Sequence, residues 1–296
     1  MICCVENKKH LALNSIFGKY DPTKTTTIRL TFMRDIKKRF KLLVAEIKKV
    51  IIEEDFFLLQ GKAKVNVAFG KNQFAFPTAQ DKISAFMDWL KELEKKNILE
   101  VKTFLGSRKG IESQWTDKYI QMTYEKGIQR ARQEMLDVGL NIPSFSEMSI
   151  QLAFRQPYHL DRVGVIYGRV FSELRGVTAA MDTQISRVLA EGMLQGLGAR
   201  EIARNIVNAV EMSIGRATTM ARTEIIRAHH LANVNEYRQY GIEEVEVKAE
   251  WSTVGDERVC PLCEEKDGKI YPLDIVEGLI PLHPNCRCMV LPALKV

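Results

Sequence analysis

CPLCEEKDGKIYPLDIVEGLIPLHPNCRC, residues 260–288, holds four cysteines and one histidine in two short clusters. The first cluster is C-x-x-C and the second is H-x-x-C-x-C. Structural zinc sites take four nitrogen or sulfur ligands in a tetrahedron, and a C-x-x-C pair supplies two of them from one tight turn. The N-terminus shows no secretory signal, and in a reducing compartment such clusters favour metal ligation over disulfide bonds. The segment therefore predicts a small module organised around a zinc ion.

Five side chains compete for the four positions of such a site. They are Cys260, Cys263, His283, Cys286 and Cys288. The expected ligands are Cys260, Cys263 and Cys286, with either His283 or Cys288 as the fourth. Two alternatives remain open: reduced and partly buried thiols, or a disulfide pair that forms once the protein leaves the reducing cytosol.

A catalytic metal would need an open coordination position and a carboxylate nearby to act as a general base. Glu264, Glu265 and Asp267 are close in sequence, but acidic residues on a short exposed loop are usually only solvated. The zinc deaminase pattern is absent, because no H-x-E occurs in the chain. A metal-dependent nuclease built around His283 is the enzymatic alternative, although no paired histidine lies upstream near a hairpin.

The positive charge of the chain is concentrated in one segment. The whole chain carries a formal net charge of +6, and residues 29–49 alone account for it, with eight basic residues against Asp35 and Glu46. Apolar residues recur there at helical spacing, which predicts a basic amphipathic helix. Its polar side carries the candidate contacts with nucleic acid or an acidic protein surface, namely Arg34, Lys37, Lys38, Lys41, Lys48 and Lys49.

The rest of the chain indicates a mainly α protein with a small C-terminal α+β module that carries the Cys/His knuckle. We expect a basic helical segment over 1–60, a helical region with a short hairpin near 64–76 over 61–175, and a last region over 176–296. Glycines at 176, 196 and 198 punctuate the central helices, a last helix runs from about 216 to 240, and alternation from Val245 to Trp251 predicts a strand. No run of about 18 apolar residues indicates a membrane span.

The stretch ARTEIIRAHH, residues 221–230, places several charged side chains within three helical turns. A catalytic pairing of Glu224 with a histidine is conceivable. The preferred interpretation is an ordinary ion pair between Glu224 and an arginine on a half-buried helix.

These segments together resemble the phage head morphogenesis proteins, also called Mu F-like minor head proteins. The resemblance covers about residues 176–291 and rests on the order of three features: the RTE helix, a W-x4-D-x-R-V-C-x-x-C strand and knuckle, and a terminal HPNCRC. Besides the Cys/His candidates, the matching motif positions are Arg222, Thr223, Glu224, Trp251, Asp256, Arg258, Pro284, Asn285 and Arg287.

The resemblance implies a minor capsid protein of a tailed phage or prophage, in a family not generally regarded as enzymatic. It would act in procapsid assembly, with the portal protein and capsid or scaffold proteins as partners, and with double-stranded DNA as a further contact. Its location would be the virion, at the portal vertex and the capsid interior, after assembly in the cytoplasm of the bacterial host.

Overall fold

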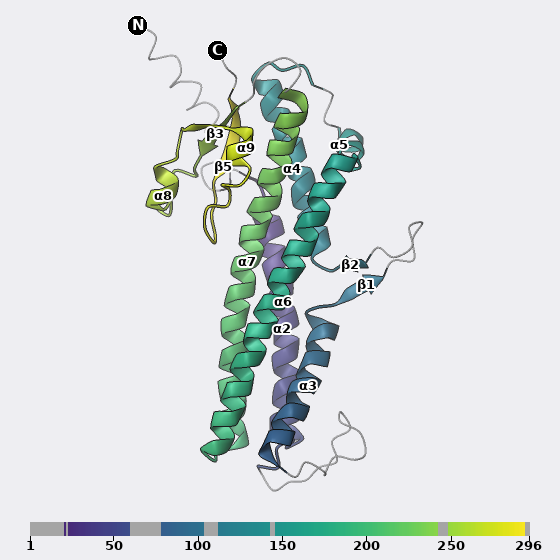
Figure 1. The fold of residues 1–296 in the computed structure, drawn as a ribbon, viewed down its shortest axis with the longest axis vertical. Coiled ribbons are helices and arrows are strands. Elements are labelled where there is room, and N and C mark those ends of the chain that lie inside the picture. The colour runs from purple at the N-terminus through teal and green to yellow at the C-terminus, as the bar shows by residue number, and fades with distance from the viewer. Residues whose placement is uncertain are drawn as a thin grey trace. The chain divides into compact units, whose positions relative to one another are not determined.

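The computed structural model describes residues 21, 23–59, 78–103, 112–142, 146–241 and 248–293. The helices are α2 (Thr26–Lys48), the π-helical turn η1 (Lys49–Glu53), α3 (Ala79–Asn97), α4 (Asp117–Asp137), α5 (Glu147–Phe154), α6 (Pro157–Leu194), α7 (Ala199–Gly241), α8 (Pro261–Glu264) and α9 (Leu273–Val276). The strands are β1 (Val101–Thr103), β2 (Glu112–Gln114), β3 (Lys248–Ser252), β4 (Ile270–Pro272) and β5 (Met289–Ala293). The expected mainly α fold with a small C-terminal α+β module is confirmed (Figure 1).

The chain forms two compact units, each assembled from segments that are distant in sequence. The first comprises Met1–Phe32, Thr116–Val170 and Thr219–Val296, and the second comprises Met33–Trp115 and Phe171–Thr218. The contiguous regions expected from the sequence, with boundaries near 60 and 175, stay a prediction. The expected hairpin near 64–76 and the start of the strand at Val245 lie outside the described residues. Within the described ranges, no helix is long and apolar enough to cross a membrane.

In the second unit, α2 buries the apolar stripe that its sequence predicts. Ile36, Phe40, Leu43 and Ile47 are each at most 1% exposed, because residues three and four apart share one face of a helix. Beyond η1, the rings of Phe56, Phe57 and Phe86 lie within 6.0 Å of one another.

Helix α3 begins with a capping box. The Thr78 hydroxyl accepts from the Asp81 amide, and the Asp81 carboxylate accepts from the Thr78 amide. The guanidinium of Arg39 stacks 4.2 Å from the centroid of the Trp115 ring, whose Nε1 donates to the Ile98 carbonyl at 2.8 Å. These contacts connect α2 to the ends of α3 and of the β1–β2 hairpin.

The central helices are longer than the glycine positions predict. Gly176 lies inside α6 and does not interrupt it, whereas Gly196, with a φ of 68°, makes the turn that ends α6. The last helix begins at Ala199 instead of near residue 216. A Cβ on Gly192 would lie 2.9 Å from the Ile202 side chain, so the hairpin between α6 and α7 requires a glycine there.

The first unit contains the C-terminal sheet, which has the antiparallel order β4-β3-β5. Ala249 pairs with Tyr271 of β4 and with Pro292 of β5. Ala249 and Trp251 are fully buried, so the expected alternation is confirmed for the described part of β3. The sheet and α9 lie beside the C-terminal end of α7 (Figure 1).

A buried carboxyl pair in the second unit predicts a dependence of stability on pH. Glu94 of α3 is 3% exposed, and burial together with the nearby Asp182 of α6 raises the pKa of Glu94 to about 9. A carboxyl whose pKa is raised on folding favours the folded state less as the pH rises from its unfolded value toward the folded one. We therefore expect Glu94→Gln to raise the melting temperature above wild type by more at pH 8 than at pH 5.

The control for this prediction is Glu92→Gln on the same helix, because the Glu92 side chain is 71% exposed. Thermal melts of the wild type and of both variants at the two pH values measure the effect. A Glu94→Gln difference that is the same at both pH values would contradict the raised pKa of Glu94.

Candidate metal centre

The C-x-x-C pair is held by the short helix α8. Cys260 precedes the helix, Pro261 occupies its first position, and the Cys263 amide donates to the Cys260 carbonyl at 3.0 Å. The same amide lies 3.4 Å from the Cys260 sulfur. Proline suits the first helical position because its missing N–H would have no partner there. The turn therefore presents both sulfur atoms on one side.

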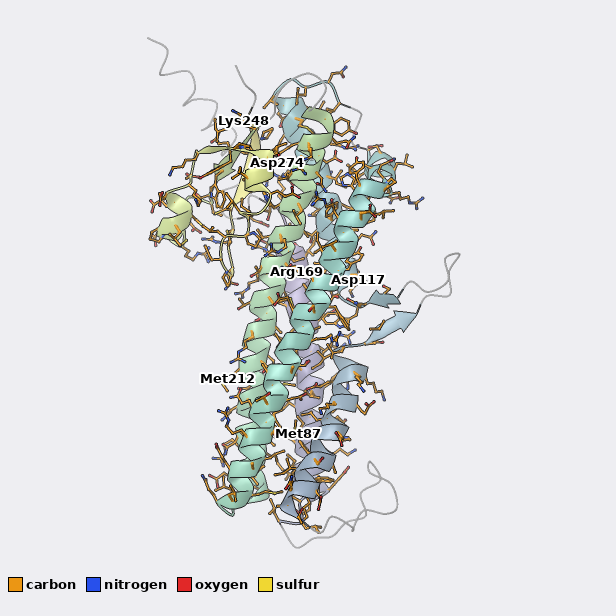
Figure 2. The ribbon with its side chains drawn as sticks, viewed as in Figure 1. Met87, Asp117, Arg169, Met212, Lys248 and Asp274 are labelled. Carbon is orange, nitrogen blue, oxygen red and sulfur yellow. The ribbon has the colours of Figure 1, made fainter. Side chains whose placement is uncertain are left out.

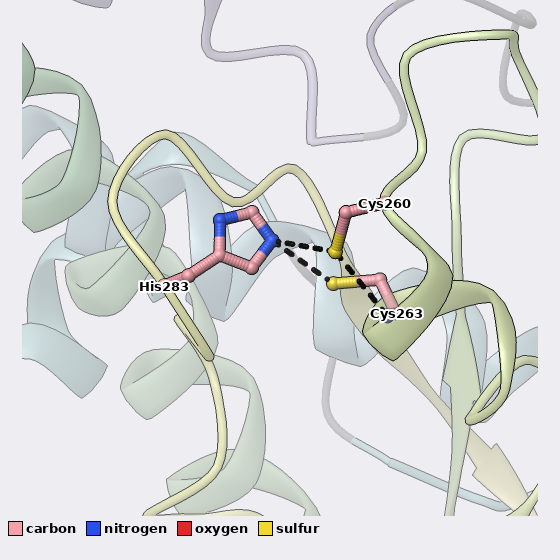
Figure 3. Close-up of side chains that lie close together, drawn as sticks. All are labelled: Cys260, Cys263 and His283. Atoms are coloured by element: carbon pink, nitrogen blue, oxygen red, sulfur yellow. Dashed lines mark hydrogen bonds between the residues drawn. The ribbon is translucent and has the colours of Figure 1, made fainter.

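His283 faces this pair of sulfurs. Its Nε2 lies 3.2 Å from the Cys260 Sγ and 3.2 Å from the Cys263 Sγ (Figure 3). Its Nδ1 lies 2.8 Å from the Pro284 carbonyl oxygen, an acceptor that fixes the proton on Nδ1. Nε2 is left with a lone pair directed at the two cysteines, the arrangement found in histidines that bind metal through Nε2.

Cys286 and Cys288 complete the Cys/His group and lie on the other side of Cys263. The ligand atoms of Cys263, Cys286 and Cys288 lie within 4.8 Å of one another, as do those of Cys260, Cys263 and His283. The Cys286 amide donates to the His283 carbonyl at 3.1 Å, so H-x-x-C forms a turn like that of C-x-x-C. The structure thus brings together all five side chains expected from the sequence, as two groups that could each hold a metal ion and that share Cys263.

The electrostatics within the group differ from one sulfur to the next. The hydrogen bond from the Cys288 thiol lowers the pKa of Cys286 to about 5, and it raises the pKa of Cys288. Burial raises the pKa of Cys263 to about 12, whereas the Cys263 amide lowers the pKa of Cys260. Thiolates, not thiols, bind metals, so a cation at this position would have to displace protons from the more buried sulfurs.

Motif residues outside the cluster hold the HPNCRC loop in place. Arg287 binds the Asp256 carboxylate through two nitrogens, at 2.6 and 2.5 Å. This ion pair, reinforced by Arg258, holds the pKa of Asp256 well below its usual range. On the other side, the backbone N–H of Asn285 donates to the Thr223 hydroxyl at 3.2 Å.

Asn285 has a further contact with the RTE helix, because Arg222 Nη1 lies 3.4 Å from its side-chain oxygen. The backbone of Asn285 is left-handed, with a φ of 63°, a conformation that asparagine tolerates better than most residues. The loop is therefore tied both to α7 and to the segment that follows β3. The family resemblance singled out these motif residues, but it did not show which of them touch.

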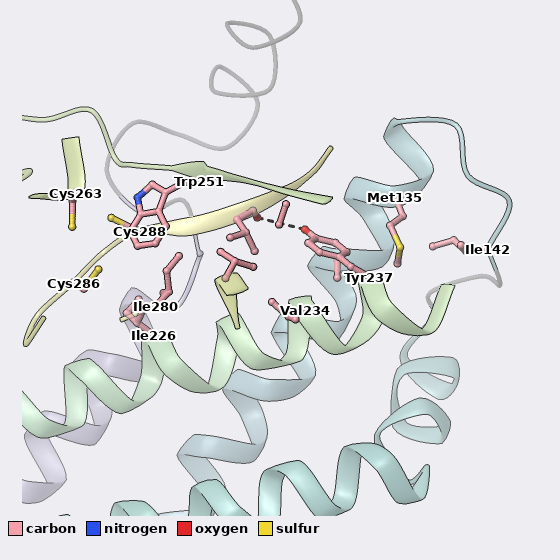
Figure 4. Close-up of a cluster of buried hydrophobic side chains, with 14 residues drawn as sticks. Met135, Ile142, Ile226, Val234, Tyr237, Trp251, Cys263, Ile280, Cys286 and Cys288 are labelled. Atoms are coloured by element: carbon pink, nitrogen blue, oxygen red, sulfur yellow. Dashed lines mark hydrogen bonds between the residues drawn. The ribbon is translucent and has the colours of Figure 1, made fainter. Parts of the chain in front are cut away.

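The Cys/His group rests on the core of the first unit. Trp251 is fully buried beside Cys263, Cys286 and Cys288, and Tyr237 of α7 belongs to the same cluster (Figure 4). The Tyr237 hydroxyl contacts the Val290 carbonyl of β5 at 3.4 Å. The sulfurs are consequently part of the packing between the sheet and α7.

Glu224 of the RTE motif makes the ion pairs that were expected. It is 2% exposed and accepts from Arg227 Nε at 3.2 Å and from Arg169 Nε at 3.3 Å. Figure 2 labels Arg169 on α6. His230, one turn further on, is buried, and its Nε2 lies 2.9 Å from the Val276 carbonyl. Burial lowers the pKa of His230 to about 4. Both side chains are therefore engaged in packing and pairing.

Carboxylates do not join the Cys/His group within the described part of the chain. Asp267 accepts from the Thr253 amide at 2.7 Å, and Glu265 pairs with Lys269 at 3.3 Å. The nuclease hypothesis relied on one of these acidic residues as a general base beside the metal. The described geometry offers no such base at the group.

The basic face, which runs along α2 and into η1, belongs to the second unit. The six candidate contacts are all exposed: Arg34, Lys37, Lys38, Lys41, Lys48 and Lys49. Lys49 lies 3.7 Å from Glu54, a weak and partly exposed pair. This face is available to a partner, while the opposite side of the helix is buried.

Comparison with known proteins shows what the C-terminal part of the chain is similar to. Residues 183–291 match the family model of the Phage Mu protein F like proteins, which confirms the resemblance seen in the sequence. The matched region contains the RTE helix, the sheet and the whole Cys/His group.

Two curated proteins are similar to the chain. The minor head protein GP7 of Bacillus phage SPP1 is 24% identical over 253 residues, which cover 78% of this chain and 76% of GP7. The uncharacterised protein MJ0329 of Methanocaldococcus jannaschii is 30% identical over 118 residues, which cover 39% of this chain and 18% of that protein. No solved structure matches the chain.

The Arg287–Asp256 pair generates a prediction about the loop. The Arg287 side chain is 20% exposed, and lysine cannot reproduce its two parallel hydrogen bonds. We expect Arg287→Lys to lower the free energy of unfolding by about 1 kcal/mol. Denaturant melts measure the loss.

The matched control is Arg258→Lys, because the Arg258 side chain contacts the same carboxylate but is 74% exposed. Its expected effect is within a few tenths of a kcal/mol. Equal losses in the two variants would show that the bidentate pair does not hold the loop.

Proposed function

We propose that this protein is a non-enzymatic minor head protein of a tailed phage or prophage that acts in procapsid assembly at the portal vertex and the capsid interior. The observation that carries the proposal is the family match over 183–291, which coincides with the RTE helix and the Cys/His module. The similarity to GP7 of phage SPP1 extends over most of both chains and supports the same role. The partners would be the portal protein and capsid or scaffold proteins, first in the host cytoplasm and then in the virion.

The structure of the first unit supports an assembly role more than a catalytic one. Its motif residues hold a loop, as Asn285 and Arg287 do, or pair within the fold, as Glu224 does. Chemistry would require a reactive group open to substrate, whereas the sulfurs of Cys286 and Cys288 are buried in the core.

Deletion of the gene in the phage or prophage that encodes the protein tests this role. We expect purified wild-type particles to contain the protein, detected by mass spectrometry, and chemical cross-links to join it to the portal protein. Particles made without it should be fewer or less infectious, and a plasmid copy should restore them. Absence from the particles, with normal infectivity of the deletion phage, would refute the proposal.

We assign the Cys/His group a structural zinc ion held by Cys260, Cys263, His283 and Cys286. The assignment follows from two matching turns, C-x-x-C and H-x-x-C, each closed by an amide of its last residue. Thiolate and imidazole are the donors that zinc prefers, and a closed set of four is typical of structural sites. Cys288 is then the hydrogen-bond donor to the Cys286 sulfur instead of a ligand.

Elemental analysis under reducing conditions, without added metal, tests this assignment. We expect about one zinc per chain. Cys286→Ser should lose the metal and lower the melting temperature, because removal of one ligand forfeits binding energy that contributes to folding. Cys288→Ser is the matched control, two residues away and equally buried, and should keep the zinc.

Two results would contradict the zinc assignment. Wild-type protein with no metal and four freely reactive thiols in this group would exclude the site altogether. Retention of zinc by Cys286→Ser with its loss from Cys288→Ser would exchange the roles of the two cysteines.

We further propose that the basic face of α2 contacts the phosphate backbone of double-stranded DNA without sequence preference. The support is the local concentration of exposed positive charge against a buried apolar stripe. Replacement of Lys37, Lys38 and Lys41 by Gln should weaken binding to a duplex. It should also reduce the slope of log K against log salt concentration by about 1 for each lysine that touches a phosphate.

The control variant replaces Lys95, Lys96 and Lys269 by Gln, which changes the net charge equally at three other exposed sites. Titrations of a fluorescent duplex at several salt concentrations compare the two variants. An unchanged affinity and slope for the α2 variant would rule out DNA contact through this face and favour an acidic protein partner.

A further inference from the structure

The first unit contains a cavity of about 490 Å³ that is separate from the Cys/His group. Its walls come from the end of α4 and the turn after it, from α5, from the start of α6 and from the end of α7. The volume falls in the range of small-ligand pockets, roughly 300–1,000 Å³. Leu140, Ile142, Leu152 and Ala153 are apolar lining residues, and Arg132 and Tyr240 are among the polar ones.

Arg132 is anchored as a fixed cation in the wall of this cavity. It is 3% exposed, and its Nε donates to the Glu236 carboxylate at 2.7 Å. Its Nη2 donates to the Tyr240 hydroxyl at 3.1 Å, and the guanidinium lies 5.3 Å from the centre of the Tyr240 ring. Two of the three guanidinium nitrogens are thus committed to partners, and the orientation of the third is set.

The third nitrogen, Nη1, has no hydrogen-bond partner among the described residues. It is also not one of the fully enclosed unpartnered atoms found among them. Because the side chain is almost wholly buried and lines the cavity, we infer that Nη1 faces that cavity. A buried donor that faces an open space is a binding feature, since leaving it unpaired costs free energy.

The charge balance around Arg132 limits what the cavity can accept. Arg132 is the one charged side chain among the described residues that line it, and no carboxylate lines it there. Behind Arg132, Glu236 also pairs with His159 Nε2 at 2.7 Å. The Glu236 carboxylate already balances the charge of Arg132, so this wall suits a ligand with at most one negative charge, whereas a phosphate monoester would place a second charge near Glu236 without a further cation.

We propose that the cavity binds a carboxylate carried on a short apolar body. The carboxylate would accept from Arg132 Nη1, and the apolar body would pack on the side formed by Leu140, Ile142 and Leu152. Two sources share this chemistry: a free carboxylic acid and the C-terminal carboxylate of a peptide chain. The proposal does not depend on the head-assembly role or on the zinc site.

Calorimetric titration of the full chain with N-acetyl-leucine and with N-acetyl-leucinamide tests the proposal. The two probes differ only in the carboxylate. We expect saturable binding of the acid and at least about 10-fold weaker binding of the amide, because charge-assisted hydrogen bonds are the stronger ones. N-acetyl-Ala-Ala-Leu then distinguishes the sources: tighter binding than the single residue indicates a chain terminus, and equal binding indicates a small free acid.

Substitutions at the cavity locate the binding. Arg132→Gln removes the charge, but it leaves Glu236 buried with one partner fewer, so a second variant is needed that keeps the charge network. Gln156→Trp places a large ring at the cavity from an exposed position and should abolish binding of the acid. Gln151→Trp, at an exposed position on α5 that does not line the cavity, is the matched control and should bind as wild type.

Three results would overturn the proposal. They are equal binding of the acid and the amide, binding by Gln156→Trp that equals wild type, and no saturable binding of any probe up to about 10 mM.

Discussion

The close approach of α4 to α7 is the constraint on which the first unit depends. A Cβ at Gly127 would lie 2.6 Å from the Ala232 Cβ and 2.7 Å from the His229 carbonyl, so the two helices can touch only where a glycine stands. The side-chain amide of Asn233, oriented to satisfy both neighbours, donates to the backbone carbonyls of His229 at 2.8 Å and Gly127 at 3.1 Å. A side chain at residue 127 would force the helices apart.

That spacing brings α7 into contact with a buried ion pair on α4. Arg130 pairs with Glu134 at 2.5 Å within α4, and the Tyr237 hydroxyl of α7 donates to the same carboxylate. Breaking a buried pair by removing one partner costs several kcal/mol, about 3–5, because the other charge is left without compensation. These contacts fix the orientation of α7 relative to α4. The sheet packs through Trp251 on the remaining face of α7.

The Cys/His group packs on the same face of α7. Thr223 and Arg222 on α7 hold Asn285, while Asp256 holds Arg287, so the HPNCRC loop reaches the C-x-x-C turn from a fixed direction. Cys286 sits in the core against α7, and a metal ion bound there would join the two turns of the module. In this account, metal binding contributes to folding of the module, and the family motif specifies a scaffold.

The sequence predicted the features that arise from local patterns. Helical spacing predicted the buried stripe of α2, and the two short spacings predicted the five metal-ligand candidates. The length of α7 was missed because the last helix was expected to begin near residue 216, whereas α7 starts at Ala199 and continues through Gly215. The cavity beside Arg132 had no sequence signal, since Arg132 and Glu236 are 104 residues apart and meet only after α4 and α7 pack.

Hydrogen–deuterium exchange of the full chain, with and without a zinc chelator under reducing conditions, tests most directly whether the Cys/His group holds the module together. The account predicts that amides of β3, β5 and the 283–288 loop lose protection when metal is removed, while the amides of α2 and α3 do not change. Unchanged protection of β3 and β5 after complete removal of metal, or equal protection before and after in a protein that never contained metal, would contradict it.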